Sequence, residues 1–109
     1  PIIYYDKKVA TLDKGSTVLG MFQELPKFTV SKIRIKEGFN LFCYTDGIIE
    51  ARNDFGDFYG SKRLLSLFSS KKSKPKKFIK SVIDDLNEFR GKNLTDDDIT
   101  LLMTKVINE

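Results

Sequence analysis

The chain has 109 residues, of which 40% are hydrophobic and 31% are charged, a composition typical of a single globular domain. It carries 19 Lys and Arg against 15 Asp and Glu, for a formal net charge of +4, and it contains no His. The lack of His excludes Ser-His and Cys-His nucleophile pairs and His-bearing zinc sites within this sequence. Catalysis by these residues would therefore rest on carboxylates, Lys, Tyr or a metal ion.

Cysteine content and hydropathy indicate a cellular compartment. The single Cys43 has no partner for an intrachain disulfide, which fits a reducing environment. No apolar run approaches the ~20 residues of a membrane-spanning helix, and the opening PIIYYDKK does not resemble a signal peptide. We therefore expect a cytoplasmic protein with no membrane contact from this segment.

The first half of the sequence favours β-strands. Residues 2–5 and 8–12 are short β-favouring runs separated by polar residues, which predicts a hairpin. Residues 28–35 alternate between apolar and polar with a change of phase, as in a strand with a bulge. Residues 39–45 form the most apolar run, which predicts a strand near the centre of a sheet.

The second half predicts two helices and a closing strand. A helix is expected over residues 61–68 with Ser61 as its N-cap, and a longer amphipathic helix over residues 75–89, ended by Gly91. Residues 99–107 are β-branched and apolar, which predicts the last strand. Strands followed by helices and one more strand indicate the α+β class, with an antiparallel sheet and helices on one face.

Basic residues are concentrated between Lys62 and Lys80, where eight Lys and Arg occur without an acidic residue. The simplest interpretation is a solvated segment between the two helices. Binding of a phosphoprotein partner is an alternative, because a basic surface attracts anions. Nucleic-acid binding is not expected, since few aromatic residues are interleaved for base stacking.

Acidic residues stand at the ends of two predicted strands. Asp46 follows the apolar strand 39–45 and precedes Gly47, and residues 96–98 are three Asp before the last strand. If these strand ends are adjacent, their carboxylates converge and repel each other unless a divalent cation lies between them. A site with oxygen ligands alone favours magnesium or manganese over zinc.

Four motifs then resemble a known family. Residues 41–53, LFCYTDGIIEARN, are similar to the YTDG-x-x-E-A hallmark of the sporulation stage II protein E-type and sigma-factor-regulating serine phosphatases, which are metal-dependent phosphatases of type 2C. Residues 15–20 resemble the loop before that strand, and residues 59–64 resemble an FG-x-x-R-L helix start. Residues 97–102, DDITLL, match the closing strand of the family.

The resemblance implies an αββα sandwich of mainly antiparallel sheets, in which two Mn²⁺ or Mg²⁺ ions activate a water molecule that attacks phosphoserine or phosphothreonine. Asp46 and Asp97 correspond to the family's ligands of one ion. Asp96 and Glu50 are expected to stay outside the site. The positions expected to support the ligands or to shape the loop around them are Gly47, Thr45, Asp98 and Thr100.

The resemblance also sets expectations for the whole protein. Residues 1–109 are expected to form the C-terminal portion of one phosphatase domain, because the family has an earlier segment with a bridging Asp that this sequence lacks. The expected substrate is a phosphorylated regulatory protein such as an anti-sigma-factor antagonist, and an upstream sensor or regulatory domain is expected in the parent protein. The chain alone is expected to be inactive. The alternative is a phosphatase-like binding module without catalytic activity.

Overall fold

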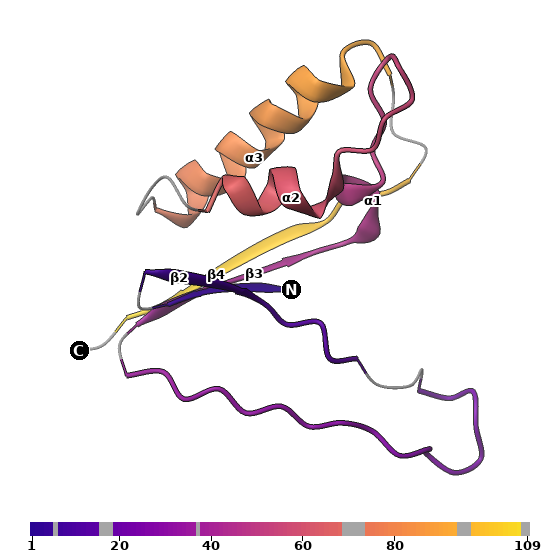
Figure 1. Cartoon of the computed structure of the whole chain (residues 1–109), viewed down its shortest axis with the longest axis vertical. Coiled ribbons are helices and arrows are strands. Elements are labelled where there is room, and N and C mark those ends of the chain that lie inside the picture. Colours follow the sequence, from indigo (N-terminus) through magenta and orange to yellow (C-terminus); the bar gives the residue numbers. More distant parts are fainter. Residues whose placement is uncertain (6, 16–18, 37, 69–73, 94–96, 108–109) are drawn as a thin grey trace.

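A four-stranded antiparallel sheet forms the base of the structure (Figure 1). The computed structural model describes residues 1–5, 7–15, 19–36, 38–68, 74–93 and 97–107. The strand order in the sheet is β2-β1-β3-β4. Strand β3 therefore pairs with β1 of the N-terminal hairpin, and β4 forms the edge beyond it. The strands are β1 (Ile2–Tyr5), β2 (Lys8–Thr11), β3 (Phe39–Tyr44) and β4 (Leu101–Val106).

Strand β3 lies between β1 and β4, which confirms the prediction of an apolar strand inside the sheet. It pairs with β1 through the register of Ile2 with Phe42. It pairs with β4 over its whole length, from Phe39 opposite Val106 to Tyr44 opposite Leu101. Because the pairing is antiparallel, the end of β3 lies beside the beginning of β4.

Three helices cover one face of the sheet (Figure 1). They are α1 (Asp46–Ile49), α2 (Gly60–Ser66) and α3 (Pro75–Arg90). The short helix α1 was not among the predicted elements. The predicted N-cap of the helix over residues 61–68, which corresponds to α2, is also wrong. Helix α2 begins at Gly60, so Ser61 lies inside it, and no side chain caps its start.

Helix α3 has the boundaries that its sequence predicts. Pro75 occupies the first turn, where its missing N–H needs no partner. Phe78, Val82 and Leu86 recur every four residues and are buried against the sheet side. Gly91 ends the helix with a φ of 61°, a backbone conformation that side chains with a Cβ rarely adopt.

The hydrophobic core lies between the helices and the sheet. Phe42 of β3 is completely buried, and its ring contacts Phe68 and Phe78, with centroids 5.4 Å and 5.6 Å away. Burying a side chain of this size stabilises the fold by about 1.5–3 kcal/mol relative to leaving it exposed. The other members of this cluster come from β1, the three helices and the segment between α1 and α2: Ile2, Ile48, Ala51, Tyr59, Leu64, Val82 and Leu86.

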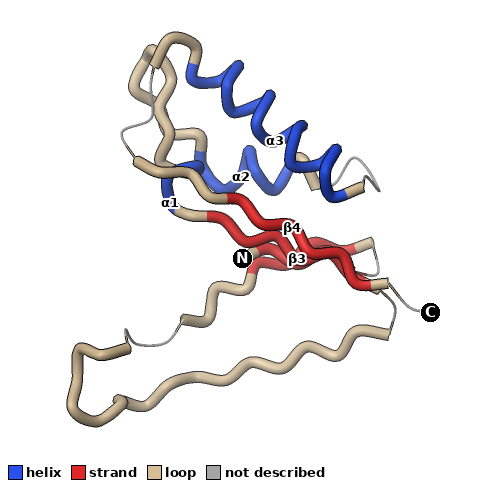
Figure 2. The backbone as a smooth tube through the Cα atoms, turned by 180° about the vertical axis from the view of Figure 1, so that it is seen from behind, coloured by secondary structure: helices blue, strands red, loops and turns tan. Residues whose placement is uncertain are grey.

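The strand predicted over residues 28–35 is not formed. This segment belongs to a long open stretch of chain between β2 and β3, on the side of the sheet away from the helices (Figure 2). Its apolar side chains Phe28, Val30 and Ile33 are exposed. Alternating residues become a strand only when a neighbouring strand pairs with their backbone groups, and no described strand does so here.

No helix among the described residues is both long enough and apolar enough to cross a membrane.

Candidate functional site

The end of β3 and the approach to β4 are joined by a small set of hydrogen bonds. The backbone N–H of Thr45 donates to the carbonyl oxygen of Thr100 at 3.2 Å, which continues the β3–β4 ladder. The Thr45 hydroxyl donates to the carbonyl oxygen of Asp98 at 3.1 Å and accepts a hydrogen bond from the Thr100 N–H at 3.0 Å. Residues 45 and 98–100 are therefore held together, although they are far apart in the sequence.

None of these three hydrogen bonds involves a carboxylate. Thr45 and Thr100 were expected to support the acidic ligands directly. Instead, the Thr45 side chain fixes the backbone of Asp98 and Thr100, and Thr100 takes part through its own backbone N–H and carbonyl. Both residues thus position the chain that carries the acidic side chains.

Gly47 allows the two segments to approach each other closely. A Cβ atom at this position would lie 2.4 Å from the carbonyl oxygen of Asp98, which is closer than real Cβ contacts occur. The backbone of Asp98 therefore passes directly against Gly47. Asp46 lies between Thr45 and Gly47, and so it stands beside the same backbone.

The charge of Asp46 acts on Tyr44, the last residue of β3. The pKa of the Tyr44 phenol is raised above its usual value, first by burial and then by the negative charge of Asp46. Asp46 itself is exposed and is the first residue of α1. An exposed carboxylate at the start of a rigid element is available to bind a cation.

Asp97 and Asp98 approach the same place from the β4 side. A carboxylate oxygen of Asp97 accepts a hydrogen bond from the Asp98 N–H at 2.8 Å, and this fixes the side chain. Asp97 lines a cavity together with Gly47. Asp98 contributes its backbone carbonyl to the contacts with Thr45 and Gly47. Asp96 lies outside the described residues.

The cavity beside Asp97 has a volume of about 1080 Å³. It extends from Gly47 and Asp97 along the loop between α1 and α2 to the turn after α3, and Asp46 is not part of its lining. Its lining is mostly polar and includes both acidic and basic side chains. The residues are Gly47, Glu50, Ala51, Arg52, Asn53, Asp54, Gly56, Phe58, Lys92, Asn93 and Asp97.

The loop wall of the cavity is held by its own hydrogen bonds. The side-chain oxygen of Asn53 accepts from the N–H groups of Phe55 and Asp57, at 3.0 Å and 2.9 Å. Arg52 and Phe58 form an isolated antiparallel bridge at the base of the loop. The loop is therefore a closed turn rather than an open connection.

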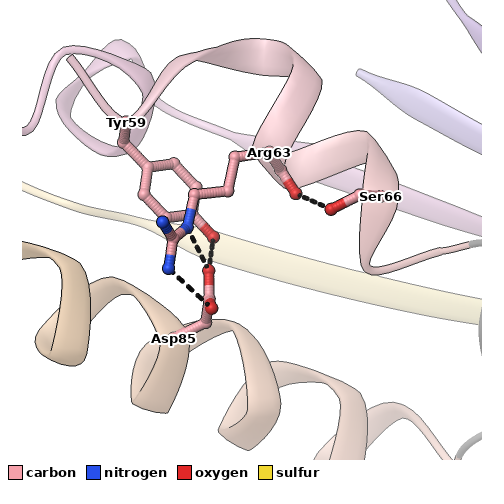
Figure 3. Close-up of polar contacts among 4 residues, drawn as sticks. All are labelled: Tyr59, Arg63, Ser66 and Asp85. Carbon is pink, nitrogen blue, oxygen red and sulfur yellow. Dashed lines mark hydrogen bonds and ion pairs between the residues drawn. The ribbon is translucent and has the colours of Figure 1, made fainter.

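Helices α2 and α3 are joined by an ion pair that the sequence did not predict (Figure 3). Arg63 donates to both carboxylate oxygens of Asp85, with distances of 2.9 Å from Nε and 3.1 Å from Nη2. The Tyr59 hydroxyl donates to the same carboxylate at 2.6 Å. The Arg63 guanidinium also lies 4.9 Å from the centroid of the Phe89 ring.

These contacts shift the pKa values of the residues that form them. The hydrogen bonds from Arg63 hold the pKa of Asp85 below its ordinary value, despite partial burial. Burial is the main cause of the raised pKa of Tyr59, and its hydrogen bond to Asp85 adds to it. Tyr59 and Arg63 carried a signal in the sequence, through the helix-start motif. Asp85 carried none, because it lies on the polar side of an amphipathic helix and resembles any solvated acid.

Comparison with known proteins identifies the family. The family model described as Stage II sporulation protein E (SpoIIE) matches residues 1–107, nearly the whole chain. The chain belongs to this family. The resemblance predicted from the YTDG-x-x-E-A and DDIT motifs is therefore confirmed.

A solved structure confirms the fold class. The SiaA-PP2C domain of Pseudomonas aeruginosa superposes with a TM-score of 0.58 at 21% sequence identity. The match covers 62% of this chain and 28% of the SiaA chain, so the described sheet and helices correspond to part of a type 2C phosphatase domain. No curated protein matches the chain. The family assignment makes this a phosphatase-family domain of the α+β class, as predicted.

Type 2C phosphatases generally use Mn²⁺ or Mg²⁺, and the acidic strand ends fit such ions in part. The side chains of Asp46 and Asp97 offer carboxylate oxygens, which these hard cations prefer. The glycine contact at position 47 brings their two segments together. Within the described residues, however, no group of three His, Cys, Asp or Glu side chains is gathered that would hold an ion. The described residues thus offer two carboxylates on adjoining segments, fewer than a complete metal site needs.

Proposed function

We propose that the chain contributes to a metal-dependent protein serine/threonine phosphatase, with Asp46 and Asp97 as ligands of one ion. One observation supports this most directly. The β3–β4 pairing brings the two acidic motifs of the family to the same end of the sheet, where Gly47 lies against the Asp98 carbonyl oxygen. When bound there, Mn²⁺ or Mg²⁺ would supply Lewis-acid activation for hydrolysis of a phosphate ester.

The residues of this chain would hold and orient the ligands in that reaction. Thr45 fixes the backbone on both sides of the site through its hydroxyl. The N–H of Asp98 holds one oxygen of the Asp97 carboxylate, which leaves the other oxygen for a cation. Hydrogen bonds of this kind set ligand orientation, and their loss commonly weakens metal binding by about 10–100-fold.

The proposed substrate is a phosphoserine on a regulatory protein, such as an anti-sigma-factor antagonist, in the cytoplasm. Family membership supports this proposal. An upstream sensor or regulatory domain would control the activity. Nucleic acid is not proposed as a partner.

The test is manganese-dependent release of phosphate from a phosphoserine protein by the full-length protein. Asp46→Asn and Asp97→Asn should each abolish the activity, because each removes a negative ligand while keeping the size of the side chain. Asp57→Asn is the matched control, since Asp57 lies in the loop and does not line the cavity. Near-normal activity of both ligand variants would refute the proposal.

The competing function is a binding module that has the phosphatase fold but no catalytic activity. It is favoured by the small number of acidic ligands that the described residues bring together. Such a module would bind a phosphorylated partner without hydrolysing it. Phosphate release by the full-length protein with manganese would exclude this alternative.

A further inference from the structure

We infer that the cavity beside Asp97 binds the residues that flank the phosphoserine of the substrate, and that Arg52 and Lys92 select acidic flanks. The inference rests on the proposed function, because it concerns the substrate of the same site. The cavity begins at Asp97 and Gly47 and is far larger than a phosphate group needs. The rest of its lining leads from Asp97 along the loop after α1 to the turn after α3.

Arg52 is the first cationic side chain in the cavity wall. Its guanidinium carbon lies 4.7 Å from the centroid of the Phe58 ring, and the backbone pairing of the same two residues fixes this stack. Within the described part of the chain, no carboxylate lies within ion-pair distance of Arg52. A stacked guanidinium keeps its N–H groups free at its edge, and these donate readily to a carboxylate.

Lys92 provides the second cation from a different segment. It follows Gly91, whose positive φ turns the chain at the end of α3 toward the cavity. Lys92 is exposed and, among the described residues, has no ion-pair partner. Two unpaired cations therefore line the same cavity, from the loop and from the helix end.

The acidic residues that line the cavity do not all offset the positive charge of Arg52 and Lys92. The Asp54 carboxylate is turned toward the end of α3, since a Cβ on Gly91 would lie 2.7 Å from its Oδ2 atom. Asp97 is held by the Asp98 N–H and belongs to the proposed metal site. Glu50 is the remaining acid, and it would weaken the attraction of an acidic peptide.

An aromatic side chain beside the cavity offers further contact area. Phe55 stands at the tip of the loop with 90% of its surface exposed, between Asp54 and Gly56, which both line the cavity. The Asn53 side chain holds this tip by accepting from the Phe55 N–H. Aromatic residues and Arg on a fixed backbone are the side chains that most often dominate protein–protein binding. The loop thus combines an apolar contact with charge selection.

Binding of labelled peptides tests the inference without requiring catalysis. The probes are two fluorescent peptides that carry a non-hydrolysable phosphonate analogue of phosphoserine and the same leucine, which can contact Phe55. They differ only in three glutamates or three glutamines after the analogue. Fluorescence anisotropy with the full-length protein, in manganese and low salt so that a cation offsets the charge of Asp97, should show tighter binding of the glutamate peptide. Arg52→Gln and Lys92→Gln should each weaken that binding about fivefold, which is the range measured for rim charge pairs.

Three further variants sharpen the test. Glu50→Gln should strengthen binding of the glutamate peptide, and Phe55→Ser should weaken binding of both peptides. Lys76→Gln is the matched control, because Lys76 is an exposed lysine on the first turn of α3 and does not line the cavity. Equal binding of the two peptides by the unmodified protein would overturn the inference. An equal loss in the Lys76→Gln control would overturn it as well, since it would show a general charge effect.

A separate measurement distinguishes this inference from the proposed function. Phosphate release from p-nitrophenyl phosphate with manganese reports catalysis alone, because this small ester carries no flanking residues. Selective binding of the glutamate peptide without phosphate release would support the acidic specificity and refute the enzymatic activity. Phosphate release without any preference between the peptides would support the enzymatic activity and refute the acidic specificity.

Discussion

Arg63 and Asp85 form a bidentate ion pair between α2 and α3, with both carboxylate oxygens accepting from one guanidinium (Figure 3). The pair matters for the candidate site because α3 ends at Gly91, beside the Asp54 side chain of the loop. Lys92 lies in the next position. The ion pair therefore helps to fix the helix end that forms one wall of the cavity.

Replacing Arg63 with Ala should lower the free energy of unfolding by about 1–2 kcal/mol, because two charge-assisted hydrogen bonds and the contact with the Phe89 ring are lost. Urea denaturation followed by circular dichroism measures the change. Lys80→Ala is the control: its ion pair with Asp84 has side-chain exposures of 78% and 63%, against 39% and 23% for Arg63 and Asp85. The control should change stability by less than about 0.5 kcal/mol. Equal effects would contradict the prediction.

The same contacts predict how stability depends on pH. The folded-state pKa of Asp85 lies below its ordinary value of 3.8, so its stabilising effect is complete above that pH and is lost as the pH falls through the folded-state value. The pKa of Tyr59 is raised above 10.0, so its effect is complete below that pH and is lost at more alkaline pH. Thermal unfolding of Asp85→Asn should therefore show a weaker loss of stability in acid than the unmodified protein. An identical acid dependence would count against this assignment.

Gly47→Ala should destabilise the end of the sheet, because the new methyl group would meet the Asp98 carbonyl oxygen. Forcing a methyl group into such a contact typically costs about 1–3 kcal/mol. Gly15→Ala is the control, since nothing lies within 4 Å of a Cβ at Gly15 and its φ is not positive. Denaturant midpoints of both variants measure the difference. A stable Gly47→Ala protein would show that the two backbone segments separate easily.

Thr45→Val should destabilise the β3–β4 end more than Thr45→Ser. Valine keeps the shape of threonine but loses the hydroxyl that bonds both Asp98 and Thr100. Because both hydrogen bonds are exposed, water can replace the lost partner, and the cost should be about 0.5–1.5 kcal/mol, whereas serine keeps the hydroxyl. Hydrogen exchange at the Thr100 amide gives a local measurement. It should accelerate in the valine variant and stay close to normal in the serine variant.

The 109-residue chain should bind manganese only weakly, with a dissociation constant in the roughly millimolar range, because few charged ligands are gathered among its described residues. Isothermal titration calorimetry measures this affinity. Asp97→Asn should remove the remaining binding, and Asp57→Asn should not. Micromolar binding by the unmodified chain would show that further ligands complete the site.

The elements that the sequence predicted well are those whose signals lie within the element itself. Helix α3 has an apolar residue at every turn, Pro75 at its start and Gly91 at its end, and each of these acts within one or two turns of the chain. Strand β3 is apolar on both faces, which favours an interior strand. The placement of Asp46 just after β3 also followed from local position, whereas β4 begins at Leu101 rather than at the predicted residue 99, so that Asp97 lies further from the strand than expected.

The features that the sequence missed depend on distant partners. Residues 28–35 alternate as a strand does, but alternation does not supply the neighbouring strand that would pair with them. The ion pair of Arg63 and Asp85 requires the crossing geometry of two helices. Helix α1 is a single short turn, fixed by the strand before it and by the contact between Gly47 and Asp98.

The antiparallel pairing of β3 with β4 makes cation binding and folding one coupled equilibrium. Asp46 and Asp97 are distant in the unfolded chain and become neighbouring segments only when the two strands align. An ion held by both would bind the native state alone, and at a hundred times its dissociation constant it would add about 2.7 kcal/mol to the free energy of unfolding. The melting temperature of the full-length protein should therefore rise with manganese concentration, as it does for any ligand that recognises only the folded chain.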